Sequence, residues 1–376
     1  MSRTWLRDLL VVLAVLASHA GCGGELLVPI GVSTPSRRGT DGTPARDSRD
    51  DDPSDDGSDD PPSAPPDDPP GDPPGEPPGD PPGDPPGEPP GEPPDDPPGD
   101  PPPGSGQCYS EPIAPDADVD DLVAAYGGSG WQDELFDIMD LRHPATGALL
   151  ALQRNDSYFG QFSDSSSWPG MVEWLDTLSH EETHLFNAYE AMDRGVHHVL
   201  FLRADLVLEL PAPDTDVARS RIYADLDPGA RNGIYAPTYL TGDQGARGFV
   251  ELLDETSCYL NEIGALGSVG EYYPGYGVSL RDGVVALLYF VEEYLALLES
   301  EEPAAWSTLH AEPAYRDAVR LLWQRTHFLR PFADAHPSLG VDDDLYRALL
   351  HTPARMDAVS RFIGWRVTDS PCVSAL

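Results

Sequence analysis

Apolar positions recur every three or four residues along one long segment, which is the spacing of an amphipathic helix. The segment starts near Ser167, which precedes a Trp-Pro-Gly stretch, and a helix stop is expected at Gly195. On a helical wheel the apolar positions share one side: Met171, Leu175, Leu178, Leu185, Phe186, Tyr189 and Met192. The other side carries a second set: Glu173, Thr177, His180, His184, Asn187 and Ala191. The pattern predicts a helix to residue 192 with one apolar face.

Other patterned segments predict more helices and two strands. The same spacing predicts helices in five further segments: 249–263, 284–298, 315–328, 344–350 and 355–362. Stretches rich in Leu and β-branched residues predict strands over 199–210 and 221–227. Three tryptophans are expected to fill the core between the C-terminal helices: Trp306, Trp323 and Trp365. The predicted fold class is α+β, with a few strands and a mostly helical C-terminal half.

Composition changes abruptly ahead of these elements. Residues 39–106 hold 25 Pro and 20 acidic residues, but no Leu, Ile, Val or aromatic residue. Such a segment cannot bury enough apolar surface to offset the entropy lost on folding, so it is predicted to be a disordered spacer. The chain therefore divides into a leader (1–22), a spacer (23–106, rich in Pro, Gly and acids from 39) and one folded domain (107–376).

The net charge excludes one class of partner. The 376 residues include 23 basic residues, all of them Arg, and 65 acidic residues, which gives a formal net charge of −42. Residues 107–376 alone hold 17 Arg and 43 acidic residues, or −26. Because nucleic-acid binding depends on clustered basic residues, nucleic acid is not expected as a partner.

The first residues have the pattern of an export signal. Two Arg precede an apolar run over 9–17, which is shorter than a membrane span, and small residues follow it. The Ala-Gly-Cys stretch at 20–22 then resembles the lipobox of bacterial lipoproteins. The resemblance implies a lipid on Cys22 and membrane attachment through that lipid. With Gly23 after the Cys, it also implies the outer membrane or cell surface of the bacterial envelope.

The domain contains the remaining three of the four cysteines. Cys108 and Cys372 lie at its two ends, where a disulfide would join the domain termini in an oxidising compartment. Cys258 would then be unpaired, and a single thiol is more typical of a small buried apolar residue than of a ligand.

The long predicted helix carries the candidate chemistry. Residues 180–184 read His-Glu-Glu-Thr-His and match H-E-x-x-H. Because His180 and His184 are four residues apart, their rings lie one turn apart and can bind one tetrahedral metal ion. Glu181 lies beside them, where it can accept a proton from a metal-bound water molecule. Histidines with only a packing role would be expected on the apolar face instead.

This helix resembles the active-site helix of the zincin metallopeptidases. The resemblance implies Zn²⁺ as the cofactor, His180 and His184 as zinc ligands and Glu181 as the general base. Zincins generally carry uncharged residues between the Glu and the second His, whereas here Glu182 is charged and lies on the apolar face. A carboxylate there must pair with an Arg or remain protonated.

A third protein ligand is required, which leaves the fourth position for water. No His follows within 185–192, so a Glu on a later helix is expected, as in gluzincins. Glu255 is the preferred candidate, because the residues around it look like the ligand helix of such enzymes. The alternatives are Glu251, Glu262 and Asp254, and the acids that do not bind the metal could orient the histidines.

Two further features concern the substrate. Tyr273 and Tyr276 lie in a Gly/Pro-rich loop and are candidates to donate a hydrogen bond to an oxyanion. By analogy with zincins, a strand over 199–210 could bind an extended peptide. The sequence thus predicts a surface-anchored, zinc-dependent hydrolase that acts on a peptide or protein. The alternative is a non-catalytic surface lipoprotein whose motif is vestigial or holds a structural metal.

Overall fold

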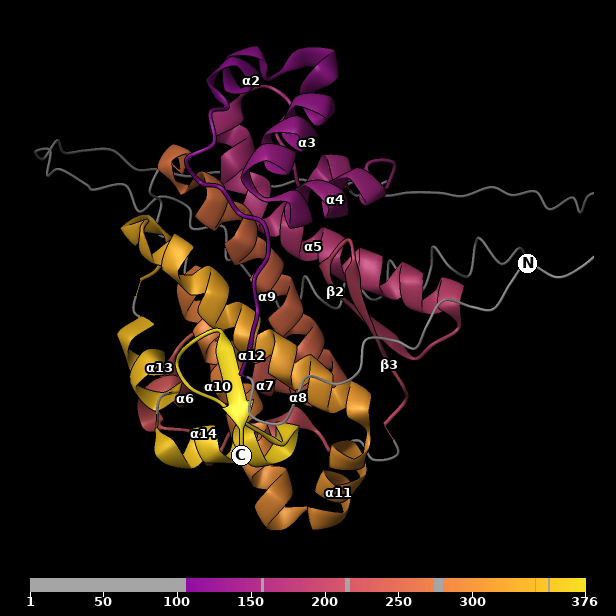
Figure 1. Cartoon of the computed structure of the whole chain (residues 1–376), viewed down its shortest axis with the longest axis vertical. Helices are drawn as coiled ribbons and strands as arrows, with labels where there is room; N and C mark the ends of the chain where they lie inside the picture. The colour runs from indigo at the N-terminus through magenta and orange to yellow at the C-terminus, as the bar shows by residue number, and fades with distance from the viewer. Residues whose placement is uncertain (1–105, 157–158, 214–216, 274–279, 342, 351) are drawn as a thin grey trace, which may run out of the picture. The chain divides into compact units, whose positions relative to one another are not determined.

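Four long helices build the core: α5 (Trp168–Arg194), α9 (Phe249–Val269), α10 (Leu280–Glu301) and α12 (Pro313–Asp334) (Figure 1). Helix α9 is central, because it packs against the other three and buries every residue except Glu251 and Tyr259. Near its start, the ring of Phe249 stacks on Tyr294 of α10 with 5.1 Å between the ring centroids. Side chains on α9 therefore face neighbouring helices on all sides.

The computed structural model describes residues 106–376 except 157–158, 214–216, 274–279, 342 and 351. The expected leader, Cys22 and the spacer up to residue 105 lie outside the described residues. The described part is mostly helical with a few strands, which agrees with the α+β class. In this part no helix combines the length and the apolar character that a membrane span requires.

Shorter helices surround the core. Three precede α5: α2 (Asp120–Ala125), α3 (Trp131–Arg142) and α4 (Pro144–Gln153). Three lie between the strands and α9: α6 (Pro228–Asn232), α7 (Tyr235–Leu240) and α8 (Gly242–Gly245). The C-terminal part adds α11 (Pro303–Ala311), α13 (Asp343–Leu350) and α14 (Pro353–Ile363). Several helices begin with Pro, whose missing N–H would have no partner in a first turn anyway.

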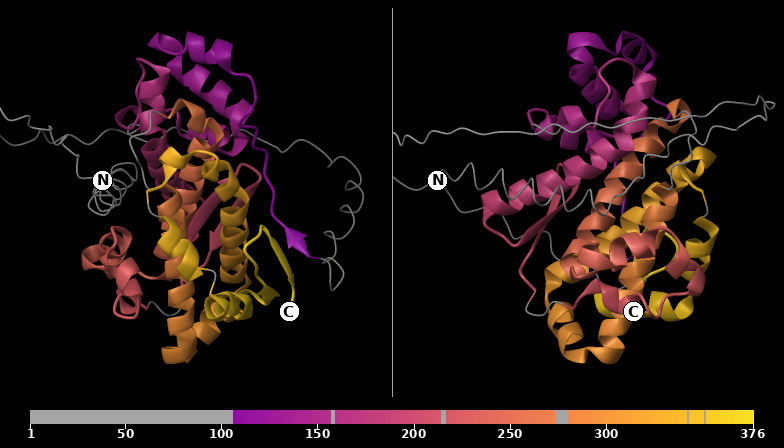
Figure 2. Two further views of the ribbon diagram at one scale, coloured as in Figure 1. Left: turned by 90° about the vertical axis from the view of Figure 1, so that its left-hand side faces the viewer. Right: turned by 180° about the vertical axis from the view of Figure 1, so that it is seen from behind.

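The strands form two small antiparallel sheets. Strands β2 (His198–Arg203) and β3 (Leu206–Leu210) make a hairpin, and β2 packs on α5. Strands β1 (Gln107–Cys108), β4 (Trp365–Arg366) and β5 (Cys372–Ala375) pair in the order β1-β5-β4. This second sheet brings the two ends of the domain together, as the left view of Figure 2 shows. Cys108 and Cys372 are opposite each other in it and form a disulfide.

The strand predicted over 221–227 is wrong. This segment forms a 3₁₀ turn, η3 (Arg219–Ile222), followed by irregular turns. Its buried apolar residues are Ile222 and Leu226, which are four positions apart rather than two. The strand predicted over 199–210 is in fact two strands, because the chain turns between Arg203 and Leu206.

The structure also differs from the predicted end of one helix and from the predicted burial of two tryptophans. Helix α9 continues past residue 263, although Gly264 follows there. A Cβ at Gly264 would lie 2.4 Å from the His143 ring, so the glycine allows the ring to pack against the helix. Of the three expected core tryptophans, Trp323 is fully buried, while Trp306 and Trp365 are only partly buried against the core.

A buried polar network ties the N-terminal segment to the core. The Arg325 guanidinium on α12 is fully buried, and its Nε lies 3.2 Å from the Glu111 carboxylate. Its Nη1 donates to Asn261 Oδ1 on α9 at 2.8 Å, and the Tyr109 hydroxyl donates to Glu111 at 2.7 Å. Burial alone would raise the pKa of Glu111, but Arg325 and His143 lower it to about 2. Glu111 and Arg325 therefore form a buried ion pair.

Candidate metal centre

Helix α5 is fixed at both ends by local contacts. The Ser167 hydroxyl accepts a hydrogen bond from the Gly170 N–H at 3.2 Å, which caps the first turn. Gly195 ends the helix with φ 68°, a left-handed conformation that glycine adopts without steric penalty. The predicted apolar face is buried from Met171 to Phe186, whereas Met192 near the end is 42% exposed.

The face of α5 that carries the histidines is also covered, because α9 packs along it. Figures 1 and 2 show the two helices side by side in the middle of the domain. His180 and Glu181 are 4% and 2% exposed, and Glu255 on α9 is 1% exposed. The helix wheel predicted a polar face, and the structure makes it an internal helix–helix contact lined by charged groups.

Both imidazoles approach one carboxylate oxygen. Nε2 of His180 lies 3.7 Å, and Nε2 of His184 lies 3.6 Å, from Oε2 of Glu255. These separations are too long for hydrogen bonds. Among the described residues, His184 Nε2 and Glu255 Oε2 have no hydrogen-bond partner. Two buried polar atoms without such partners, facing each other, are what a site for a cation would provide.

The other nitrogen of each ring is held by a carboxylate. His184 Nδ1 lies 2.7 Å from Asp254 Oδ2, and His180 Nδ1 lies 3.1 Å from Glu262 Oε2. Because an ionised carboxylate only accepts hydrogen bonds, Nδ1 of His184 is the protonated nitrogen. A proton on Nδ1 leaves the lone pair of a neutral imidazole on Nε2, which is the atom directed at Glu255.

Asp254 also links the site to the β2–β3 hairpin. Its Oδ1 accepts a hydrogen bond from Asn187 Nδ2 at 2.7 Å and lies 3.0 Å from His198 Nε2. Asn187 Oδ1 in turn accepts from the Phe201 N–H, while Asn261 donates to the Phe201 carbonyl. Both backbone groups of Phe201 are therefore occupied, and a peptide cannot pair with β2 at this position.

These contacts give different roles to the four acids that the sequence offers as the third metal ligand. Glu251 accepts a hydrogen bond from the Gly248 N–H at 3.2 Å and so caps the start of α9. Asp254 and Glu262 each hold an Nδ1 atom, as described above. Glu255 is the acid with one carboxylate oxygen within 3.7 Å of both Nε2 atoms.

Cys258 is a further potential ligand that the sequence analysis treated as a packing residue. One ligand atom from each of His180, His184 and Cys258 lies within 4.8 Å of the others, so these three residues could hold a metal ion. Cys258 lies one turn after Asp254 on α9 and is fully buried. Its position three residues after Glu255, on the same helix side, is the pattern that could have indicated it.

The charges of the site are strongly coupled. Burial opposes a charge on His184, but the neighbouring Cys258 sulfur and the Asp254 carboxylate raise the pKa of His184 well above its usual value. Burial raises the pKa of the Cys258 thiol to about 12, so the thiol stays protonated at neutral pH and Asp254 supplies the negative charge. Burial would raise the pKa of Asp254 as well, but His184 and His198 hold it well below the usual range.

The two remaining carboxyls behave differently from each other. Burial acts to raise the pKa of Glu255, but His184, His180 and Arg219 together lower it, so this carboxylate is ionised. Burial raises the pKa of Glu262 to about 7, despite its contact with His180. Arg219 was not predicted as a site residue. It is fully buried in η3 and donates a hydrogen bond to the Gln244 carbonyl at 2.7 Å.

The two acids inside the motif are both buried. Oε2 of Glu181 has no hydrogen-bond partner among the described residues. Glu182 is 0% exposed, and neither of its carboxyl oxygens has a hydrogen-bond partner in the described part of the chain. Burial, followed by the charges of Asp156 and Glu181, raises the pKa of Glu182 to about 9. Of the two expected outcomes for Glu182, the raised pKa favours the protonated one.

The tyrosines near the site differ from those expected. Tyr273 is buried, and burial together with Asp176, Glu173 and Glu262 raises its pKa, which places it at the Glu262 end of the site. Tyr276 lies outside the described residues. The sequence analysis did not single out Tyr259, whose ring packs edge-on against His180 with 5.1 Å between centroids. Its hydroxyl lies 2.9 Å from that of Tyr239.

No family model, curated protein or solved structure matches this chain.

Proposed function

We propose that this domain binds zinc through His180, His184 and Glu255 and hydrolyses peptide bonds, as the zincin metallopeptidases that α5 resembles do. One observation carries the proposal: two Nε2 atoms lie 3.7 and 3.6 Å from one carboxylate oxygen, with no hydrogen bond between them. With the export signal and lipobox of the sequence, the proposal extends to a lipid-anchored enzyme on the bacterial cell envelope that acts on a peptide or protein.

Two of the three separations among the proposed ligand atoms are close to those of a zinc site. Two atoms bound tetrahedrally at about 2.05 Å from zinc are separated by roughly 3.3 Å. The measured separations of 3.6 and 3.7 Å exceed this by only a few tenths of an ångström. The carboxylates at the two Nδ1 atoms support the same assignment, because carboxylate partners fix the ring orientation of zinc-binding histidines.

In hydrolysis, the metal and the side chains around it would each have a separate role. A zinc ion bound at this site would lower the pKa of a water molecule and polarise a substrate carbonyl. The Glu181 carboxylate, buried beside the histidines, would accept the proton of the attacking water and transfer it to the leaving amine. Asp254 and Glu262 would hold the two imidazoles in orientation while the charge on the site changes.

Cys258 favours a second candidate function, a structural zinc site. Structural zinc sites have four protein ligands, whereas catalytic sites have three and leave one position for water. Because Cys258 lies within reach of the histidines, it could supply the fourth ligand and close the site. The near-complete burial of His180, Glu181 and Glu255 is consistent with such a closed site. The domain would then be a non-catalytic surface protein.

Metal analysis of purified full-length variants tests the proposal. Zinc near one per chain is expected in the unaltered protein and in the control His197→Ala, an exposed histidine three residues beyond α5. The metal should be lost in His184→Ala and strongly reduced in Glu255→Ala, because each removes a ligand. Protein without bound metal, or zinc retained in His184→Ala, would contradict the proposed site.

Two further substitutions separate catalysis from structure. Glu181→Gln should retain zinc and abolish cleavage of a broad peptide library, since the amide cannot act as the base. Cys258→Ser should leave both zinc content and cleavage unchanged if the site is catalytic. Loss of zinc in Cys258→Ser, together with an uncut library in the unaltered protein, would favour the structural site.

A further inference from the structure

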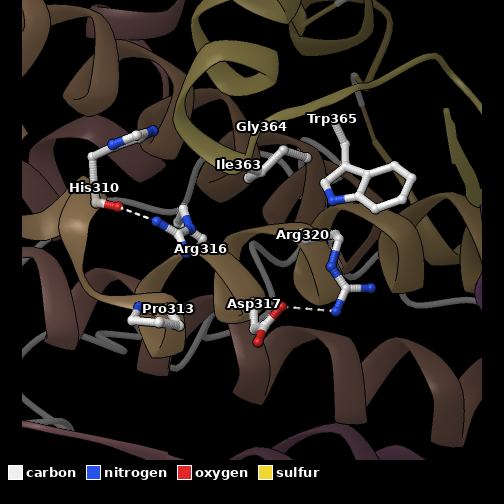
Figure 3. A pocket seen from close by; sticks show the side chains of 8 residues that line it. All are labelled: His310, Pro313, Arg316, Asp317, Arg320, Ile363, Gly364 and Trp365. Atoms are coloured by element: carbon white, nitrogen blue, oxygen red, sulfur yellow. Dashed lines mark hydrogen bonds and ion pairs between the residues drawn. The ribbon is translucent and has the colours of Figure 1, made fainter. Parts of the chain in front are cut away.

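A cavity lies among C-terminal residues of the domain that the proposed metal site does not use. It has a volume of about 350 Å³ and is formed where α11, α12 and the end of α14 meet. Figure 3 shows His310 and Arg316 on one side of it and Arg320 with Trp365 on the other. Its volume falls at the lower end of the range for small-molecule sites, roughly 300–1,000 Å³. An occupant would be about the size of one amino-acid residue.

The cavity carries a positive charge in a strongly acidic domain. Arg316 and Arg320 are one turn apart on α12, so both guanidinium groups lie on the same helix face. Arg320 donates to Asp317 at 2.9 Å, which neutralises one of the two charges. Arg316 donates to the main-chain carbonyl of His310 at 2.6 Å and has no acidic partner among the described residues. One positive charge is left over for a bound group.

The positive charge at the cavity comes from the Arg316 side chain and not from the N-terminus of α12. Glu312 accepts a hydrogen bond from the Ala314 N–H, so a backbone donor at the helix start is already satisfied. An anion in the cavity would therefore be recognised by the planar guanidinium of Arg316, which binds a carboxylate through two parallel hydrogen bonds.

The opposite wall is apolar and is positioned by a tight turn. Gly364 ends α14 with φ 73°, and this left-handed conformation lets the chain reverse so that Trp365 enters β4 beside the cavity. Trp365 is only partly buried, and Ile363 next to it is 4% exposed. A half-buried indole beside a guanidinium offers a flat apolar surface to a ligand that also carries a negative charge.

We propose that this cavity binds an organic monocarboxylate with an apolar body, the carboxylate on Arg316 and the body against Trp365. The single uncompensated charge matches a carboxylate better than a phosphate dianion. The same chemistry is present in free small acids and in the C-terminal residue of a peptide. The inference is independent of the metal site, since none of its residues takes part in that site.

Titration of full-length protein with four probes tests the inference: N-acetylphenylalanine, its neutral amide, acetate and inorganic phosphate. Binding is followed by calorimetry and by tryptophan fluorescence. N-acetylphenylalanine should bind at least tenfold more tightly than each of the other three. Arg316→Gln should weaken this binding about tenfold. The matched control is Arg231→Gln, because Arg231 is also half-buried and donates only to a main-chain carbonyl.

Two more variants keep the result interpretable. Trp365→Phe should retain the fold and remove the fluorescence change, and His184→Ala should bind N-acetylphenylalanine unchanged. Equal affinity for the acid and its amide, equal affinity for phosphate, or full affinity in Arg316→Gln would overturn the proposal. Acetyl-Ala-Ala-Phe with a free carboxylate then assigns the source: binding as tight as that of N-acetylphenylalanine supports a peptide C-terminus, and weaker binding supports a free small acid.

Discussion

Replacement of Glu182 by Gln is expected to stabilise the protein at neutral pH. The Glu182 carboxyl is fully buried, lacks hydrogen-bond partners within the described residues, and has a pKa raised from 4.5 to about 9. In the unfolded chain the same carboxyl ionises near its ordinary value. The native state therefore retains a proton that the unfolded state releases, so folding becomes less favourable as the pH rises between these two values.

The magnitude follows from the shift of the pKa. Each pKa unit corresponds to about 1.4 kcal/mol, so at pH 7 the raised pKa of Glu182 disfavours folding by roughly 3 kcal/mol. The contribution is fully favourable below about pH 4.5 and is lost progressively up to about pH 9. Gln has the same shape and does not titrate in this range. The stability gained in Glu182→Gln should therefore increase by about 4 kcal/mol between pH 5 and pH 8.

Urea denaturation at several pH values, with a chelator present, measures this effect without proton-linked metal binding. Glu173→Gln is the matched control, because Glu173 lies on the same helix and is exposed. Parallel pH profiles for the unaltered protein and Glu182→Gln would refute the reasoning. So would a loss of stability in Glu182→Gln at every pH, since it would mean that the native carboxyl is ionised and paired.

Three other outcomes are expected. Arg325→Met should destabilise the fold by about 3–5 kcal/mol in urea, because it removes the arginine that pairs with the buried Glu111 carboxylate. The exposed ion pair of Arg154 should be worth less than about 1 kcal/mol in Arg154→Met. Zinc affinity should fall about tenfold per pH unit below the raised pKa of His184, because a proton and zinc compete for Nε2, and calorimetry in two buffers should detect the released proton. Removal of the Cys108–Cys372 disulfide, which links residues 264 positions apart, should lower the free energy of unfolding in urea by about 2–5 kcal/mol. An unchanged unfolding midpoint would contradict the prediction for Arg325→Met or for the disulfide, whichever variant shows it.

Local patterns predicted the helix of the motif well. Ser167 and Gly195 mark the ends of α5 through capping contacts that involve only neighbouring residues. Glu255 was preferred because the residues around it look like the ligand helix of gluzincins, and its carboxylate does approach both histidines. These features depend on short-range contacts or on a resemblance, and both can be recognised without knowledge of the packing.

The Cys108–Cys372 disulfide was predicted from the positions of the two cysteines, but other features that depend on packing between distant segments were not. Cys258 and Tyr259 approach the histidines only because of the rotation of α9 against α5, which no local pattern specifies. The space that Gly264 leaves in the middle of α9 is filled by the His143 ring, which comes from a residue 121 positions earlier. The false strand over 221–227 arose because β-branched and aromatic residues there resemble a strand, although burial follows a spacing of four.

The joined termini of the domain have a mechanical consequence. Cys108 is bonded to Cys372, and Tyr109 donates to the Pro371 carbonyl beside it. A force applied to the chain before Gln107 is transmitted through the disulfide to both β1 and β5, so neither strand can separate from the sheet alone. Such a force would thus act on a covalent link before it reached the helices that hold the histidines.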